Sequence, residues 1–318
     1  MLPYFAANLL TIFFVFIGYR FKFNDISLKT MFVLSALPLI ILAGLKHRKV
    51  GTDTGTYIDF FDKTKTLPDF FQRVAEQGEP GYWFLNLLGH QFTNNYFILF
   101  TFSAIIITAC YLYCIKVFNL KTLSLAALLL IGPYFTQLNG NRQAIAVAIF
   151  AVSVIFILRK QPIRFIMSIF IGCLFHKSII ICLPLYYMFK GEITTRKVMV
   201  IIFLFMILLT FFQLFISIAS SVDSRYSSYG VQQETRGGVI VSAFNILLLI
   251  WFVFCRRINA HTLATKTYDT LLVIYLLGAL ISILSVTLGV DPSGFLRMSW
   301  YFIQMNIFLL PMTILSFK

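Results

Sequence analysis

Residues 46–81, KHRKVGTDTGTYIDFFDKTKTLPDFFQRVAEQGEPG, form the longest polar interval of a chain that is otherwise a succession of apolar segments. Six of the 12 acidic residues lie in this interval. The whole chain has 318 residues, of which 59% are hydrophobic and only 12% are charged. So few charges cannot cover so much apolar surface in water, so lipid is the solvent of most of the chain. We interpret residues 46–81 as the water-facing edge of a site embedded in a membrane.

Nine apolar segments follow one another, each of about the length that crosses a bilayer as a helix. They lie at about 3–19, 31–45, 96–115, 122–138, 143–158, 198–220, 239–255, 270–290 and 297–315. Two shorter apolar pieces, RFIMSIFIGCLF and SIIICLPLYYMF, are separated by His176 and Lys177 and are too short to cross comfortably. The pattern predicts an all-α polytopic membrane protein with about nine to eleven transmembrane segments, in one integral domain over residues 1–318.

Charge placement predicts the orientation. With the N-terminus outside, the inner side receives 15 of the 26 basic residues but only three of the 12 acidic ones, as the positive-inside rule requires. This assignment works only if the two short pieces enter and leave from the same face, so we predict a re-entrant helical hairpin with His176 at its outer tip. The basic residues lie in small clusters between apolar segments, which argues against a nucleic-acid partner.

Residues 46–95 then form an outer loop. Aromatic residues recur at helical spacing at positions 57, 60 and 61 and again at 70 and 71, and Pro68 suits the first turn of a helix. We therefore predict short amphipathic helices on the outer membrane surface, followed by a turn at residues 77–81. The five cysteines lie within apolar segments, and we interpret them as small buried hydrophobic residues.

Five arginines fall on the predicted outer side, and Arg142 and Arg297 each open an apolar segment. Snorkelling to lipid headgroups is one interpretation of such residues. The other is phosphate binding, because the planar guanidinium binds phosphate oxygens in pairs. We predict that the outer arginines together hold a pyrophosphate. They are Arg48, Arg142, Arg225, Arg236 and Arg297.

Three further residues each allow two interpretations. His176 either bonds a backbone carbonyl at the hairpin tip or acts as a base near neutral pH. Asp53 lies in GTDTG, where small residues let a substrate approach the backbone, or it caps the following helix. Glu79, before Pro80, is a turn residue or a site residue. No Walker, GxGxxG or zinc-ligand spacing occurs, so we expect no cofactor and no metal.

Several motifs, in order, resemble the EpsG family of Wzy-like bacterial polysaccharide polymerases. They are RKVGTDTGTY at 48–57, EPGY at 79–82, NRQAIA at 141–146, FHKS at 175–178, PLY at 184–186 and RMSWYF at 297–302. The loop DSRYSSYGVQQETR at 223–236 is similar in place and character. The resemblance covers most of the chain.

The resemblance implies a GT-C-like membrane glycosyltransferase at the outer face of the bacterial cytoplasmic membrane. Such enzymes join oligosaccharide units carried on undecaprenyl pyrophosphate, which is both donor and acceptor, and a chain-length regulator protein is a further partner. On the matched positions we predict catalytic roles for Asp53, His176 and Arg142. We predict substrate contacts for Arg48, Thr52, Thr54, Tyr57, Glu79, Gln143, Arg225, Tyr226, Arg236 and Arg297.

Two alternatives stay open at this point. A flippase for lipid-linked oligosaccharide is disfavoured, because transporters tend to place their site near the midplane between paired repeats. Here the polar candidates lie toward one face, and no repeat is visible. An O-antigen ligase shares the chemistry of a polymerase and differs in its acceptor.

Overall fold

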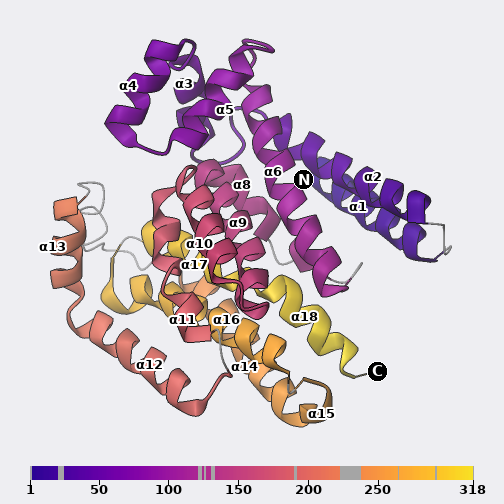
Figure 1. Cartoon of the computed structure of the whole chain (residues 1–318), viewed down its shortest axis with the longest axis vertical. Coiled ribbons are helices and arrows are strands. Elements are labelled where there is room, and N and C mark those ends of the chain that lie inside the picture. The colour runs from indigo at the N-terminus through magenta and orange to yellow at the C-terminus, as the bar shows by residue number, and fades with distance from the viewer. Residues whose placement is uncertain are drawn as a thin grey trace. The chain divides into compact units, whose positions relative to one another are not determined.

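The computed structural model describes residues 2–20, 25–120, 124, 127–129, 133–189, 192–222, 238–263, 265–290 and 292–317, and every element described there is helical (Figure 1). Contacts divide the chain into two compact units, Met1–Tyr186 and Tyr187–Lys318. The prediction of one integral membrane domain over residues 1–318 stays a prediction.

The first unit begins with three long helices that are interrupted by three short ones. The elements are α1 (Leu2–Arg20), α2 (Asp25–Gly44), α3 (Thr54–Asp62), α4 (Leu67–Gln77), α5 (Pro80–His90), α6 (Phe97–Phe118), η1 (Pro133–Phe135), α8 (Thr136–Asn139), α9 (Asn141–Leu158), α10 (Pro162–Cys173) and η2 (Lys177–Cys182). The boundary between the units falls within α11 (Leu185–Phe189). The second unit contains α12 (Thr195–Thr210), α13 (Phe212–Val222), α14 (Val239–Ile258), α15 (Ala260–Leu263), α16 (Lys266–Leu288), α17 (Pro292–Ile303) and α18 (Asn306–Leu315).

Helix α9 is the centre of the first unit. It packs against α6, α8, α10 and η2, and 78% of its residues are buried. Four alanines, at positions 144, 146, 148 and 151, are buried along it. Such small residues let neighbouring helix backbones approach closely. Helix α9 is therefore a core helix of a bundle, and its N-terminal residues Asn141 and Arg142 have a fixed position within that unit.

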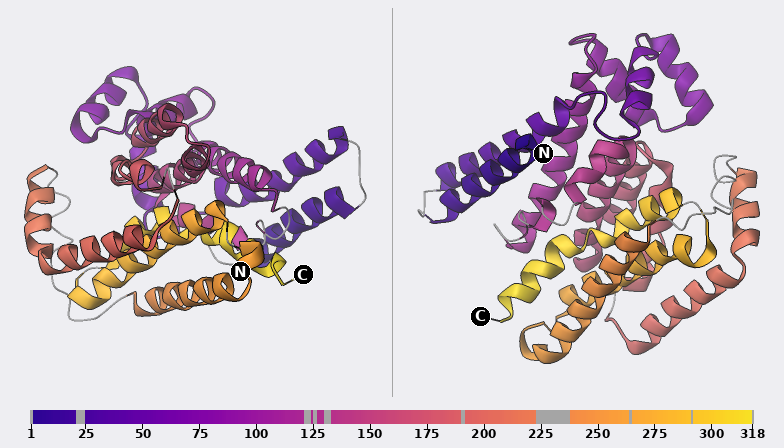
Figure 2. Two further views of the ribbon diagram at one scale, coloured as in Figure 1. Left: turned by 60° about the horizontal axis from the view of Figure 1, so that its bottom comes forward. Right: turned by 180° about the vertical axis from the view of Figure 1, so that it is seen from behind.

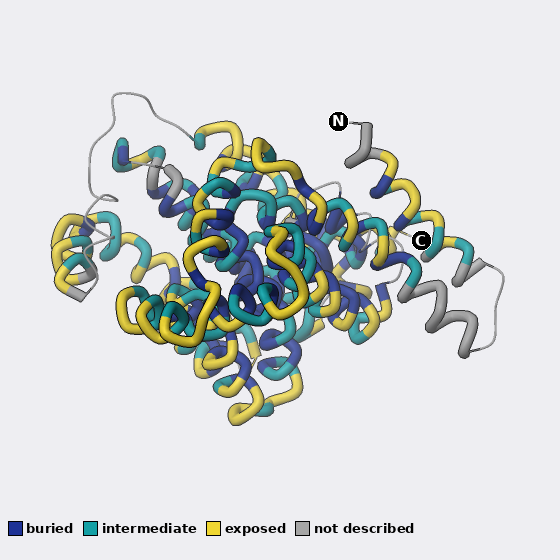
Figure 3. The backbone as a smooth tube through the Cα atoms, turned by 90° about the horizontal axis from the view of Figure 1, so that it is seen from above, coloured by how far each residue is buried: buried dark blue, intermediate teal, exposed yellow. Residues whose placement is uncertain are grey.

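The helix pair α1–α2 lies side by side at the edge of the first unit, with α2 packed on α6 (Figures 1 and 2). Along α1, exposed and intermediate positions outnumber buried ones, as the helix that starts at the N label in Figure 3 shows. In the second unit, α16 packs against α12, α14, α17 and α18. In helix α14, only 22% of the residues in the most apolar stretch are buried. Most of its surface is therefore available to lipid.

Four described helices, α6, α9, α14 and α16, are long and apolar enough to cross a membrane, and the number rises to six if two bent pairs are counted as spans. These helices agree with a membrane-embedded, all-helical protein. The described residues contain fewer membrane-crossing helices than the nine to eleven that the sequence predicts. They omit part of segment 122–138. The described end of that segment forms only the short elements η1 and α8.

The segment predicted to cross at 198–220 is sharply bent. Helices α12 and α13 meet at an angle of 80° at Phe211. The residue after the bend, Phe212, is buried in an apolar cluster with Leu284, Val290 and Phe295, and its ring centroid lies 5.5 Å from that of Phe295. Burial of this ring stabilises the bent arrangement, and no proline is needed to cause it.

The amphipathic helices predicted in 46–95 are present as α3 and α4. Helix α4 begins with a capping box between Thr66 and Asp69, with Pro68 in its first turn. The predicted turn at His176 is also present, between α10 and η2, which pack against each other. The second arm begins as a 3₁₀ helix. The orientation of these elements in a membrane stays a prediction.

The loop 46–53 is tied to the short helix α8. The Lys46 Nζ donates to the Leu138 carbonyl at 3.0 Å, and the Thr52 amide donates to the Asn139 Oδ1 at 3.0 Å. Gly51 lies against the same carbonyl with a φ of 83°, and a Cβ there would overlap the Leu138 oxygen. Only glycine fits this position, because both the backbone angle and the close approach exclude a side chain.

We expect Gly51→Ala to destabilise the protein by at least about 2 kcal/mol, since it adds a strained φ and a clash. Thermal unfolding of the purified protein in detergent measures this. Gly55→Ala is the matched control: its nearest contact would be the Arg48 Nε at 4.0 Å, so its midpoint should stay near that of the wild type. Equal midpoints for the two variants would contradict the fit of this loop on α8.

Candidate functional site

The turn before α5 places an acidic side chain inside the first unit. Gly78 and Glu79 have φ values of 69° and 61°, and these two left-handed residues reverse the chain before Pro80 starts α5. The turn is held by the Trp83 Nε1, which donates to the Gly78 carbonyl at 2.8 Å. The Gly81 amide donates to the Leu174 carbonyl at 2.8 Å. The Glu79 side chain is 0% exposed as a result.

The Glu79 carboxylate joins three segments of the chain. Its Oε2 lies 2.6 Å from the Arg142 Nη1 at the start of α9. Its Oε1 lies 3.0 Å from the His176 Nδ1 and accepts the Lys177 amide at 3.2 Å, at the hairpin turn. We call Glu79, Arg142 and His176 the Glu79 triad. The sequence predicted all three as site residues, and the structure brings them together.

The surroundings keep the Glu79 carboxyl ionised. Burial by itself raises its pKa, but the hydrogen bond from His176 and the charge of Arg142 outweigh this, so the pKa lies below its usual range. An ionised carboxylate only accepts hydrogen bonds. The proton between it and His176 is therefore assigned to the Nδ1, which leaves the Nε2 as the ring nitrogen with a free lone pair in the neutral imidazole.

Arg142 is held from several sides. Its guanidinium lies 5.3 Å from the Phe60 ring centroid and 5.6 Å from that of Tyr82, so two aromatic faces contact the cation. The side chain is 14% exposed, and its Nε is buried with no hydrogen-bond partner in the described part of the chain. This arginine is thus packed in the unit and is not a snorkelling side chain.

The residues predicted around Asp53 form the adjoining loop. Thr52 donates from its hydroxyl to the Asp53 carboxylate at 3.0 Å. Asp53 is the N-cap residue of α3 but makes no side-chain capping bond, so the capping interpretation is not supported by a side-chain contact. Thr54 is buried and donates to the Val50 carbonyl. Arg48 is exposed and lies 3.5 Å from Asp59.

Tyr57 connects this loop to the triad. It is buried, and its ring meets that of Tyr82 edge to face at 5.8 Å. Gln143, which follows Arg142 in α9, is buried as well. Arg297 belongs to α17 in the second unit, and no geometry relates it to the triad. The predicted contacts Arg225, Tyr226 and Arg236 lie outside the described residues. That the outer arginines converge on a pyrophosphate stays a prediction.

Sequence reasoning missed the residues that surround the triad. Tyr82 and Trp83 are fully buried, and the EPGYW sequence indicated only a turn and an apolar patch. Lys46 is also buried, and this burial lowers its pKa to about 7, although the charge of Asp53 opposes the shift. The sequence did contain an indication of their importance. Tyr82 lies within the family motif at 79–82, and Lys46 lies beside the family motif at 48–57.

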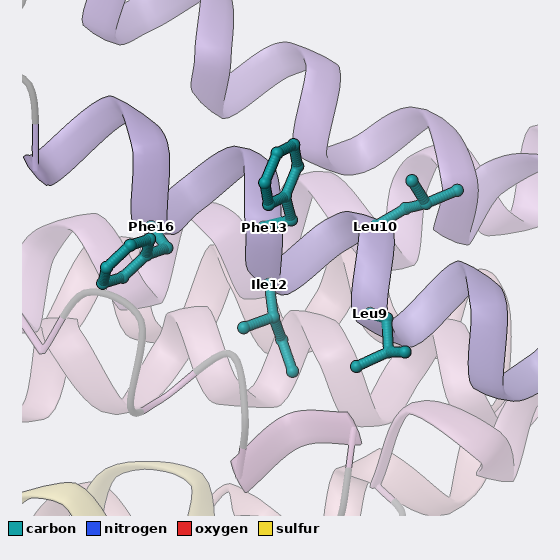
Figure 4. A pocket seen from close by; sticks show the side chains of 5 residues that line it. All are labelled: Leu9, Leu10, Ile12, Phe13 and Phe16. Carbon is teal, nitrogen blue, oxygen red and sulfur yellow. The ribbon is translucent and has the colours of Figure 1, made fainter.

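A hollow along α1, in the first unit, is lined by apolar side chains. It measures about 530 Å³ and is lined by five side chains of α1, Leu9, Leu10, Ile12, Phe13 and Phe16 (Figure 4). Such a surface suits lipid and offers no group for catalysis. Among the described residues, no group of three or more His, Cys, Asp or Glu side chains is placed to hold a metal ion.

The long apolar helices define a membrane protein, and the buried Glu79 carboxylate, held by Arg142 and His176, defines a candidate catalytic site within its first unit. The chain belongs to the EpsG family, whose model matches residues 29–318. This membership suggests a role like that of a polysaccharide polymerase. No curated protein and no solved structure matches the chain.

The triad makes a prediction about stability and pH. Glu79→Gln should cost about 3 kcal/mol at pH 7, because it leaves Arg142 without its buried partner. The pKa of Glu79 is lowered by folding, so its contribution is present above its unfolded pKa of about 4.3 and is lost as the pH falls through the lower folded value. Unfolding midpoints of both proteins, measured in detergent between pH 3 and 7, should converge at the acid end.

The matched control is Glu76→Gln on α4. Glu76 forms an exposed pair with Arg73 at 2.9 Å, and pairs of this kind contribute little. Its midpoint should follow the wild type at every pH. A Glu79→Gln protein as stable as Glu76→Gln at pH 7, or a gap that persists unchanged at pH 3, would contradict the role given to the Glu79 carboxylate.

Proposed function

We propose that this protein is a polysaccharide polymerase of the GT-C-like type, which joins oligosaccharide units carried on undecaprenyl pyrophosphate at the outer face of the bacterial cytoplasmic membrane. Family membership over residues 29–318 supports the polymerase role, and the long apolar helices support the membrane location. The single observation that carries the mechanism is the contact of the buried Glu79 carboxylate with the His176 Nδ1 at 3.0 Å.

In this proposal His176 is the general base. A carboxylate on the Nδ1 fixes the tautomer and the ring orientation and stabilises the imidazolium that forms when the Nε2 takes a proton. The His176 side chain is 24% exposed, whereas Glu79 is 0% exposed. An incoming hydroxyl can therefore reach the imidazole but not the carboxylate. Glu79 acts through His176 and is a positioning residue.

The reaction proposed is a displacement at a sugar carbon. The hydroxyl oxygen at the non-reducing end of the acceptor unit forms a bond to the anomeric carbon of the growing chain. The bond from that carbon to the pyrophosphate oxygen breaks, and the pyrophosphate keeps the electron pair. The hydroxyl proton passes to the His176 Nε2. A base in this position typically accelerates such a step by about 10²–10⁴-fold.

The leaving group needs positive charge that is fixed in advance. The Arg142 Nη1 is bonded to Glu79, so we assign this arginine first to holding the carboxylate. Arg48 is 61% exposed in its loose pair with Asp59, and exchange of that carboxylate for a phosphate oxygen costs little at the surface. We propose Arg48 as a ligand of the pyrophosphate. Arg225, Arg236 and Arg297 remain proposed ligands from the sequence. Asp53, predicted from the sequence as a catalytic residue, is proposed to orient the sugar, and Thr52 and Tyr57 are proposed to contact the substrate, because they lie in or beside the adjoining loop.

His176→Gln tests the proposal, because glutamine fills a similar volume but cannot serve as the base. Purified protein is incubated with its native lipid-linked repeat unit, and the products are separated on a gel. Polymer should form about 10²–10⁴-fold more slowly, while the amount of folded protein stays at the wild-type level. His47→Gln is the control, since His47 is exposed and accepts only the Lys49 amide in the described residues.

If His176→Gln made polymer at the wild-type rate and with the wild-type distribution of lengths, the assignment of the base would be overturned. If the wild-type protein bound the lipid-linked unit but made no product longer than that unit, the polymerase proposal itself would be wrong. In a strain that lacks the protein, lipid-linked units should accumulate on the outer face. Their accumulation inside would favour a flippase.

A further inference from the structure

The second unit contains a cavity that the proposed reaction does not use. It measures about 420 Å³ and opens between α12 and α14 over α16. Thr194, Thr195 and Val198 line it from the start of α12, Arg256 and Arg257 from the end of α14, and Asp269 from the first turn of α16. The wall therefore combines charged and apolar groups.

The two arginines of this cavity differ in their partners. Arg256 donates from its Nε to one carboxylate oxygen of Asp269 at 2.7 Å and from its Nη2 to the other at 3.1 Å. These two hydrogen bonds fix its guanidinium. Arg257 is exposed, and no hydrogen bond or ion pair joins it to the described residues. The three side chains together carry one net positive charge. Arg257 is thus the guanidinium available to an anion, and its planar fork matches phosphate oxygens.

The start of α12 adds amide donors on the opposite wall. The Thr194 side chain accepts from the Lys197 amide at 3.4 Å. The amides of Thr194 and Thr195, both of which line the cavity, have no intrahelical acceptor because the helix begins there. Amides in this position attract negative charge, and the helix dipole reinforces the attraction. An anion in the cavity would lie between these amides and Arg257.

The apolar part of the wall identifies the kind of anion. Val198, Val253, Leu272 and Val273 line the same cavity. One helical turn from Val198 and Val253, the exposed side chains of Ile202 and Ile250 continue this apolar surface along α12 and α14. A free phosphate would leave this apolar wall unmatched. A molecule with a phosphate at one end and hydrocarbon at the other would cover both parts.

We propose that this cavity binds an anionic phospholipid, with its phosphate between Arg257 and the start of α12 and its chains along α12 and α14. Arginines at the end of α14 also suit the helix dipole and the inner side of a membrane. The helix dipole and the inner-side preference explain why arginines lie at the end of α14. Neither requires a cavity in which the start of α12 lies opposite those arginines.

The test uses the full-length protein in a neutral detergent and soluble lipids with two eight-carbon chains. Phosphatidylglycerol should raise the unfolding midpoint in a saturable manner, whereas phosphatidylcholine with the same chains should bind at least about tenfold more weakly. Arg257→Gln should weaken the binding of phosphatidylglycerol by about tenfold or more, because it removes a charge-assisted contact. Arg196→Gln removes an equal charge from the same region without touching the cavity, and should bind like the wild type.

Each remaining outcome would overturn the proposal. Inorganic phosphate that saturates the site as tightly as phosphatidylglycerol would mean that no lipid chains are required. Equal binding of the two lipids, or equal losses in Arg257→Gln and Arg196→Gln, would mean that general charge or hydrophobicity causes the effect. The comparison of headgroups uses the wild-type protein alone, so it distinguishes these outcomes even if a variant does not fold.

Discussion

A carboxylate taken out of water is the constraint on which the first unit depends. Glu79 is 0% exposed, and an isolated charge in such a place costs several kcal/mol. The cost is offset because Arg142, His176 and the Lys177 amide all donate to its two oxygens. Removal of any one donor leaves the others bound to an acid that is less well stabilised. The turn, the start of α9 and the hairpin are thus fixed together.

The same interaction gives the imidazole its proposed chemistry. The Glu79 carboxylate contacts the His176 Nδ1 and thereby leaves the Nε2 as the nitrogen that can accept a proton. Arg142 keeps the carboxylate charged and is itself held between Phe60 and Tyr82. The loop 46–53 is tied by Lys46 and Gly51 to α8, and α8 immediately precedes α9. In this way the polar interval and the core helix, far apart in sequence, contribute to one site.

Much of this could be predicted from local patterns. Helical spacing and Pro68 predicted α4, and a break between two short apolar pieces predicted the turn at His176. The partner of Glu79 was not predictable, because the EPG sequence indicates a turn whether or not the side chain is buried. The 80° bend at Phe211 was missed for a related reason. It depends on packing of Phe212 against distant residues, and hydropathy sees only a continuous apolar run.

The sequence distances within the triad have a consequence for biogenesis. Glu79 precedes Arg142 by 63 residues and His176 by 97. A ribosome therefore releases the acid long before its counter-charge and its hydrogen-bond donors, so Glu79 lacks these partners until the segment around residue 176 has been synthesised. Only then can the segment before α5 reach its final position, which makes completion of the first unit a late event in synthesis.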